Sequence, residues 1–195
     1  ICTGEKPSEV SFDVIKQLKA NRSKENLRRL LGAFTVGDAG GAFVITKSGG
    51  GPRLDLMRFK TNSMLSNLCY AKRKEGYIEF EMNMETISRA MISEHEQMMG
   101  DTYSGLGWGP EDIDSLFCHQ VGARPHRRMA EMASVPISKA PITYNYFGNL
   151  TSATFAVNYD ANRPKKNDKF LFLGAGSGCS ICQIGLDYSA IPRIN

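Results

Sequence analysis

The sequence predicts a layered α/β fold. Strand-like apolar or alternating segments recur along the chain, helix-like segments separate the later ones, and glycine-rich turns lie between many of them. Apolar residues make up 42% and charged residues 23% of the 195 residues, an ordinary globular composition that excludes a mainly disordered chain. The length suits one domain or part of a larger one.

Charge, hydropathy and cysteine content exclude several classes of protein. Lys and Arg (24) exceed Asp and Glu (20) by +4, too weak an excess to indicate a nucleic-acid partner. We expect no membrane span, because no run reaches the roughly 18 apolar residues required. The five cysteines lack the pattern of a secreted disulfide framework, so we expect a cytoplasmic protein. Cys179 and Cys182 form a CxxC, but no further ligands follow, so we expect no metal site and two small buried residues.

The first quarter of the chain predicts helices flanked by strands. Residues 1–4 resemble the middle of a buried strand, and the chain begins with neither Met nor a signal pattern, so we expect a fragment, a processed chain or half of a split protein. Residues 11–31 carry apolar side chains at helical spacing around a polar break. Residues 42–46 indicate a buried strand after a glycine turn, and residues 48–52 a loop.

The middle of the chain predicts two strands and a helix. Residues 54–60 and 77–82 alternate as strands do. Residues 85–99 predict a helix with one apolar stripe, on which His95 is expected as a core or interface residue.

The last part alternates strands with helices. We expect a turn and short strand over residues 112–119, a helix with one basic side over 123–133, an apolar helix from Asn149 to about residue 162, and strands over 169–173 and 179–188.

Two polar residues are candidates for chemistry. His119 ends a predicted strand, and strand C-termini in α/β sheets face the usual ligand crevice. Asn149 precedes a predicted helix, where by itself it would suit an N-cap.

Basic and glycine-rich segments leave alternatives open. Arg124, Arg127 and Arg128 form either a solvated helix face or an anion site for a phosphate-bearing carrier. The glycines of residues 174–178 predict a sharp turn that brings main-chain N–H groups close to a ligand, and too little sequence follows for a dinucleotide fingerprint. Residues 37–41 lack the GK[ST] of a P-loop, so we expect close packing there.

Four sequence blocks occur in one order: GDAGGA at 37–42, FCHQ at 117–120, YFGNLTSA at 146–153 and LGAGSG at 173–178. Together, with the spacing of His119 and Asn149, they resemble the C-terminal part of β-ketoacyl-ACP synthase III-type enzymes of the thiolase superfamily. Within that family, the HQVG that begins at His119 and the final GSG resemble the olefin-biosynthesis (OleA-type) thiolases.

The resemblance implies a five-layered α-β-α-β-α thiolase fold of two similar halves, with residues 1–84 ending the first half and 85–195 forming the second. It implies Claisen condensation of fatty acyl-CoA or acyl-ACP by a dimer of the complete unit, without a further cofactor. His119 and Asn149 would be the catalytic hydrogen-bond donors, and the main-chain N–H of Ala175 or Gly176 would complete a second oxyanion hole.

One departure from the family pattern is large. The family's nucleophilic cysteine lies upstream of the matching blocks, and none of the five cysteines stands in its context. We therefore expect a companion chain or an N-terminal segment to supply it. Two alternatives stay open: a non-catalytic partner subunit that shapes the acyl tunnel and interface, and an acyl- or CoA-binding module without chemistry.

Overall fold

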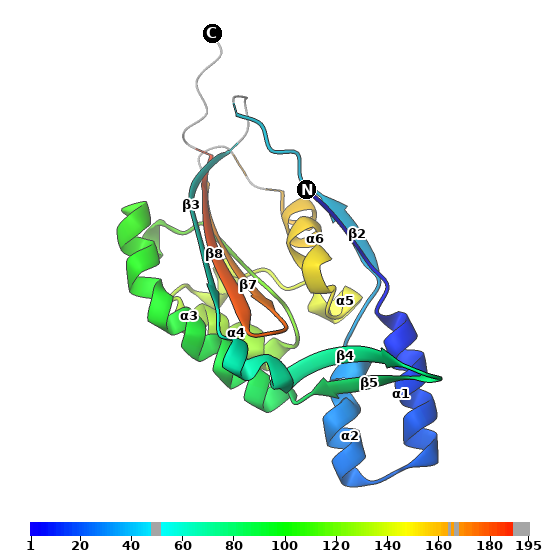
Figure 1. The fold of residues 1–195 in the computed structure, drawn as a ribbon. Helices are drawn as coiled ribbons and strands as arrows, with labels where there is room; N and C mark the ends of the chain where they lie inside the picture. Colours follow the sequence, from blue (N-terminus) through cyan, green and yellow to red (C-terminus); the bar gives the residue numbers. More distant parts are fainter. Residues whose placement is uncertain (48–51, 164, 166–167, 189–195) are drawn as a thin grey trace.

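A four-stranded sheet, in the order β3-β8-β7-β6, forms the centre of the computed structural model, which describes residues 1–47, 52–163, 165 and 168–188 (Figure 1). Its strands are listed in spatial order: β3 (Arg53–Thr61), β8 (Ser180–Asp187), β7 (Lys169–Gly176) and β6 (Ser115–Cys118). β6 and β7 are parallel, whereas the other two pairs are antiparallel. β7 is buried from Phe170 to Leu173, as expected for a central strand covered on both faces.

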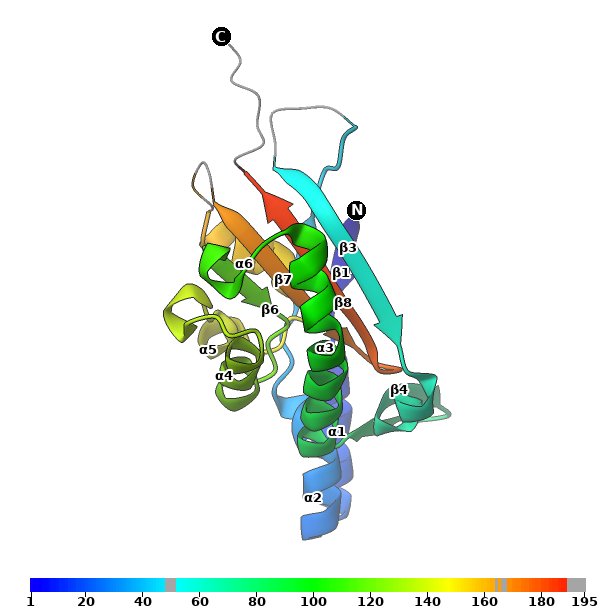
Figure 2. The same cartoon turned by 90° about the vertical axis from the view of Figure 1, so that its left-hand side faces the viewer.

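Helices cover both faces of this sheet. α3 (Met84–Leu106) and α4 (Ala123–Met132) lie on one face, and α6 (Thr154–Ala161) lies on the other (Figures 1 and 2). Alternate residues of β6 divide between them: Leu116 and Cys118 pack in the core under α3 and α4, and Phe117 packs with the aromatic side chains next to α6. The predicted layered α/β fold is therefore confirmed.

A smaller unit lies beside the sheet. α1 (Ser8–Ala20) and α2 (Lys24–Leu30) pack against the hairpin of β4 (Cys69–Lys74) and β5 (Tyr77–Met82) around Val14, Leu30 and Phe80. β1 (Cys2–Glu5) and β2 (Ala39–Ala42) form a separate two-stranded ribbon. The remaining elements are short: η1 (Leu31–Phe34), η2 (Ser63–Leu68), η3 (Pro110–Asp112), η4 (Ile137–Lys139), α5 (Tyr144–Phe147) and η5 (Thr151–Ala153).

Most predicted elements are confirmed, with shifted ends. The helical segment divides at its polar break, where the Ser23 hydroxyl accepts the Asn26 N–H and caps α2. α3 continues past residue 99 and ends at Gly107, whose left-handed φ of 64° suits a helix C-terminus. Of the loop predicted at residues 48–52, residues 48–51 lie outside the described residues.

Two strand predictions are wrong in their burial or extent. Residues 1–4 overlap β1, but Ile1 is 82% exposed. The second ribbon strand is Ala39–Ala42 rather than residues 42–46, and Val44 is 91% exposed. The physical reason is that β1 and β2 pair with each other, so that alternate side chains face outward.

The predicted division of the chain at residue 84 stays a prediction. Nevertheless, β3, which that prediction assigns to the first half, pairs along its length with β8. No helix in the described part of the chain is both long and apolar enough to cross a membrane.

We expect acid to destabilise the fold through His95. This side chain is fully buried between α3 and β8, where its Nδ1 accepts a hydrogen bond from Gln183 Nε2 at 3.2 Å. Burial lowers the pKa of His95 to about 4, from 6.5. The unfolded chain then binds a proton below pH 6.5 that the folded protein does not, so the free energy of unfolding falls as pH drops from 6.5 towards 4.

The measurement is urea unfolding between pH 7 and 4 for the wild type and His95→Gln. Each such histidine contributes a slope of at most about 1.4 kcal/mol per pH unit. We expect the variant to lose one histidine's share of the pH dependence, and identical slopes would contradict the assignment.

Candidate functional site

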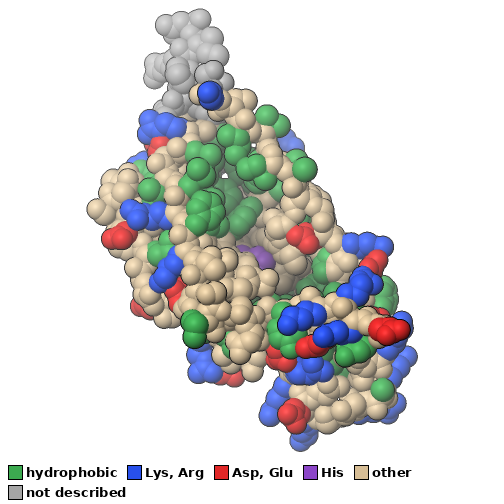
Figure 3. Space-filling model, in the orientation of Figure 1, with side chains coloured by type: hydrophobic (Ala, Val, Ile, Leu, Met, Phe, Trp, Pro, Cys, Tyr) green, Lys and Arg blue, Asp and Glu red, His purple; other side chains and the backbone are tan. Residues whose placement is uncertain are grey.

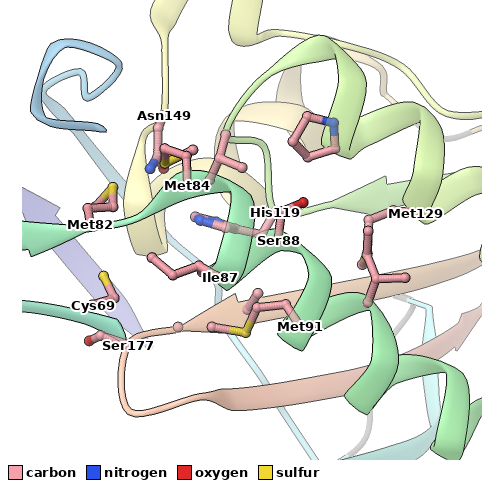
Figure 4. A pocket seen from close by; sticks show the side chains of 15 residues that line it. Cys69, Met82, Met84, Ile87, Ser88, Met91, His119, Met129, Asn149 and Ser177 are labelled. Carbon is pink, nitrogen blue, oxygen red and sulfur yellow. The ribbon is translucent and has the colours of Figure 1, made fainter. Parts of the chain in front are cut away.

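A pocket opens where α3, the end of β6, the Asn149 turn and the β7–β8 turn meet (Figure 4). It holds about 630 Å³ of empty space, part of it open to solvent. His119, Asn149, Ala175 and Gly176 all line it. Figure 3 shows a hollow on one face of the molecule, bordered by hydrophobic side chains and with a histidine side chain at its lower edge. The structure thus brings together His119, Asn149 and the Ala175–Gly176 main chain, to which the family resemblance assigns oxyanion-binding groups.

His119 directly follows β6. Its main-chain N–H donates to the Leu173 carbonyl at 2.8 Å, which continues the β6–β7 pairing and directs the imidazole to the carboxyl end of the sheet. Burial lowers the pKa of His119 to about 4, and the main-chain carbonyl of Thr151 opposes this shift in part. The imidazole is therefore neutral at pH 7 and carries one N–H.

Asn149 is held by three hydrogen bonds. Its main-chain N–H donates to the Thr35 carbonyl at 2.6 Å, and its carbonyl accepts the Gly37 N–H at 2.9 Å. Its side-chain Oδ1 accepts the Thr151 N–H at 2.9 Å. Among the described residues no hydrogen-bond partner lies at Nδ2, so the amide of this 3% exposed side chain is available to a molecule in the pocket. The N-cap alternative is wrong for α6, which begins only at Thr154.

The glycine-rich segment forms a hairpin. Ala175 and Gly176 end β7, Gly178 turns the chain with φ of 78°, and β8 returns antiparallel. A returning strand in place of a helix excludes the dinucleotide-binding arrangement at this position. Ser177 also lines the pocket, and the sequence reasoning missed it.

Cys69 lines the pocket as well, and the sequence reasoning missed it too. It begins β4 opposite Met82, a strand that the prediction omitted although the Glu75-Gly76 pair marks a hairpin turn. Burial, with a smaller contribution from Glu81, raises the pKa of the Cys69 thiol. Cys69 lies on a strand and not at a helix N-terminus, so a protonated thiol is expected at pH 7.

The other buried cysteines are structural. Cys118 is fully buried in the core, and burial raises its pKa to about 12. In the CxxC, Cys179 is buried and Cys182 half-buried. No cluster of three or more His, Cys, Asp or Glu side chains within the described ranges could hold a metal ion.

The rest of the pocket wall is largely apolar. Ile87 and Met91 come from the α3 stripe that the sequence predicts, and Met82, Met84 and Met129 join them. Methionine side chains adapt to irregular shapes, so this wall suits a flexible apolar group.

The three predicted anion-binding arginines lie next to the pocket and not in it. Arg124, Arg127 and Arg128 are exposed on α4, whereas Pro125 and Met129 of the same helix line the pocket.

Gln120 ties the histidine segment to the asparagine segment. It is 1% exposed, its Oε1 accepts the main-chain N–H groups of Thr143 and Tyr144 at 2.9 Å each, and its Nε2 donates to the Pro141 carbonyl at 2.9 Å. The end of β6 and the chain leading to Asn149 are thereby fixed to each other.

Replacing Gln120 with Leu is expected to lower the free energy of unfolding by about 2–4 kcal/mol, because two N–H groups lose their acceptor. The exposed Gln97, whose Oε1 accepts from Lys60 Nζ, provides the control, and Gln97→Leu should change the free energy of unfolding by less than about 0.5 kcal/mol. Urea denaturation measures both, and equal effects would contradict the anchoring role.

Comparisons with known proteins agree with the resemblance. The family model of the 3-oxoacyl-[acyl-carrier-protein] synthase III C-terminal region matches residues 104–187. The chain is 25% identical to an acyl-CoA:acyl-CoA alkyltransferase of Shewanella oneidensis, over 89% of this chain and 54% of that protein. It is 27% identical to a 3-oxopimeloyl-[acyl-carrier-protein] synthase of Brucella abortus, over 78% of this chain and 52% of that protein.

Solved structures show the same fold. A glutamate-to-alanine variant of Xanthomonas campestris OleA superposes with a TM-score of 0.79 at 18% identity, over 95% of this chain and 56% of that one. The 3-oxoacyl-[acyl-carrier-protein] synthase III of Aquifex aeolicus superposes with a TM-score of 0.70 at 23% identity, over 79% of this chain and 50% of that one. The chain spans about half the length of the curated relatives that it matches. The chain thus has a thiolase-like fold, and its residues 104–187 match the family model of the 3-oxoacyl-[acyl-carrier-protein] synthase III C-terminal region.

Proposed function

We propose that this chain supplies the histidine and asparagine of an acyl-thioester condensing enzyme. The observation that carries the proposal is that a neutral imidazole and an unpaired carboxamide N–H₂ line one apolar pocket beside the β7–β8 main chain. The relatives named as acyl-CoA:acyl-CoA alkyltransferase and as synthases of acyl-carrier-protein substrates support the reaction class.

The chemistry begins with a covalent acyl intermediate. A thiolate attacks an acyl-CoA or acyl-ACP thioester, the new thioester forms, and the carrier leaves as its thiol. The main-chain N–H of Ala175 or Gly176 would stabilise the oxyanion of this step. We assign the thiolate to a companion chain or an N-terminal segment, because the thiol in the described pocket, Cys69, has a raised pKa.

The carbon–carbon bond needs an enolate of a second thioester. It forms by loss of an α-proton or of carbon dioxide, and its oxygen becomes negative. His119, through a ring N–H, and Asn149, through Nδ2, would donate hydrogen bonds to that oxygen. The enolate carbon then attacks the held acyl group and expels the thiolate, which leaves a β-keto product. We expect no further cofactor, because the acyl groups are already activated as thioesters.

Arg124, Arg127 and Arg128 fit the phosphates of a CoA or of a carrier's prosthetic arm, because guanidinium groups bind phosphate strongly and lie here on the face next to the pocket. The family resemblance supports a dimer of the complete unit. The five free cysteines accord with a reducing cytoplasm.

Replacing His119 or Asn149 with Ala in the assembled enzyme should lower kcat for condensation by about 100- to 1000-fold, because each removes a donor worth about 3 kcal/mol. Asn145→Ala, at an exposed position four residues before Asn149, is the control and should leave kcat unchanged. The assay for condensation measures the free CoA that is released from acyl-CoA. Full turnover by both site variants would refute the catalytic role and favour a non-catalytic partner subunit.

Isotope-labelled acyl-CoA should leave its acyl group on a cysteine other than Cys69. The protonated thiol of Cys69 reacts slowly at pH 7. Mass spectrometry of each polypeptide, after trapping of the acyl-enzyme, locates the label. Stoichiometric label on Cys69, lost in Cys69→Ser, would contradict the external source of the nucleophile.

A further inference from the structure

Thr151 has an unusual main-chain conformation. Its φ of 50° lies in the left-handed region, which is unfavourable for a β-branched residue. Ser134 shares this conformation with φ of 56°, but it follows α4 at the position where a left-handed residue normally ends a helix. Thr151 ends no helix. Such strain persists only where the surroundings enforce it, and it concentrates at functional sites.

Both main-chain polar groups of Thr151 face the candidate donors. Its N–H donates to Asn149 Oδ1 at 2.9 Å, and this bond turns Nδ2 of the carboxamide towards the pocket. Its carbonyl lies beside the His119 imidazole, where it favours a proton on the ring, and also accepts the Thr154 hydroxyl at 2.9 Å. One residue therefore touches both side chains on which the proposed oxyanion hole depends.

We propose that Thr151 is a positioning residue, whose strained main chain holds the carboxamide of Asn149 and the imidazole of His119 in the orientation in which both line the pocket. The catalytic effect of this positioning rests on the proposed function, whereas the hydrogen bond that orients Asn149 does not. It concerns the main chain of Thr151, because its hydroxyl donates only to the adjacent Leu150 carbonyl at 2.8 Å.

The surroundings supply the force that keeps Thr151 strained. On one side, residues 35–37 hold Asn149 through two main-chain hydrogen bonds. This approach is so close that a Cβ on Gly37 would lie 2.0 Å from the Phe147 carbonyl oxygen. On the other side, the hydroxyl of the next residue, Ser152, hydrogen-bonds to Glu5 and Thr3 of β1. The turn is thus fixed at both ends, and Thr151 between them cannot relax.

The test compares three substitutions in the assembled enzyme. Thr151→Gly removes the strain and keeps both peptide groups, but frees their orientation. We expect an unchanged or higher Tm and a kcat lowered about 10- to 100-fold, with KM changed less than about 2-fold, since misplaced groups cost rate rather than binding. Thr151→Asn should retain kcat within about 3-fold, because Asn tolerates the left-handed region. Ser134→Gly, the matched relief of strain away from the pocket, should leave kcat unchanged.

A second measurement does not depend on turnover. With selective ¹⁵N labelling of asparagine, the two side-chain N–H signals of Asn149 report its orientation. We expect them to shift and broaden in Thr151→Gly and to stay near wild type in Thr151→Asn and Ser134→Gly. Wild-type kcat and unchanged Asn149 signals in Thr151→Gly would overturn the proposal. So would an equal loss of kcat in Thr151→Asn.

Failure of the proposed function would look different. If His119→Ala and Asn149→Ala keep full turnover, the condensing role fails, while the Asn149 signals still decide whether Thr151 orients the carboxamide. If those two variants lose turnover and Thr151→Gly does not, the condensing role stands and the positioning role fails.

Discussion

The parallel pairing of β6 with β7 is the constraint on which the site depends. It runs from Ser115 opposite Phe170 to Cys118 opposite Leu173, and the His119 N–H adds one more hydrogen bond. Because parallel strands end at the same edge, His119 and the residues after Leu173 emerge together. The sheet thereby delivers a side-chain donor and main-chain donors to one place, although about 55 residues separate them along the chain.

Asn149 reaches the same place by a different route. It belongs to no strand of the sheet and makes an isolated parallel bridge with Val36. Gln120 fixes the segment before it, and the residue 35–37 segment fixes its main chain. The donor from β6 is therefore positioned by regular structure, and the donor from the turn by single hydrogen bonds. A shift of residues 35–37 would therefore move Asn149 directly, whereas His119 is held by the sheet.

Elements with strong local patterns could be predicted from the sequence. The β6–His119 segment and the β7–β8 hairpin carry apolar runs bounded by glycine or polar residues, and both form where expected. α4, predicted as a helix with one basic side, also forms there. β4 was missed because its last four residues, Ala71 to Lys74, are exposed and three of them are charged, so that only the turn at Gly76 marks it. The exposure of β1 and β2 was not predicted, because strand propensity does not show which face of a strand other elements bury.

His119 and Asn149 could be predicted from the sequence, but most of the other residues that line the pocket could not. Cys69, Ile87 and Met129 come from three elements that lie far apart along the chain, and only their tertiary packing makes them neighbours. The burial that lowers the pKa of His119 and raises that of Cys69 is likewise a product of packing. Sequence spacing can identify a histidine as a candidate site residue, but it does not predict which side chains bury the imidazole.

The methionines of the pocket wall carry a consequence for the chemical durability of the protein. Met82, Met84, Met91 and Met129 all line a space that is partly open to solvent. Peroxide converts a thioether to a sulfoxide, which is polar and chiral, and reductases specific for each epimer restore it. Oxidation would thus make the apolar pocket wall polar without modifying His119 or Asn149. The reductases would restore the apolar wall.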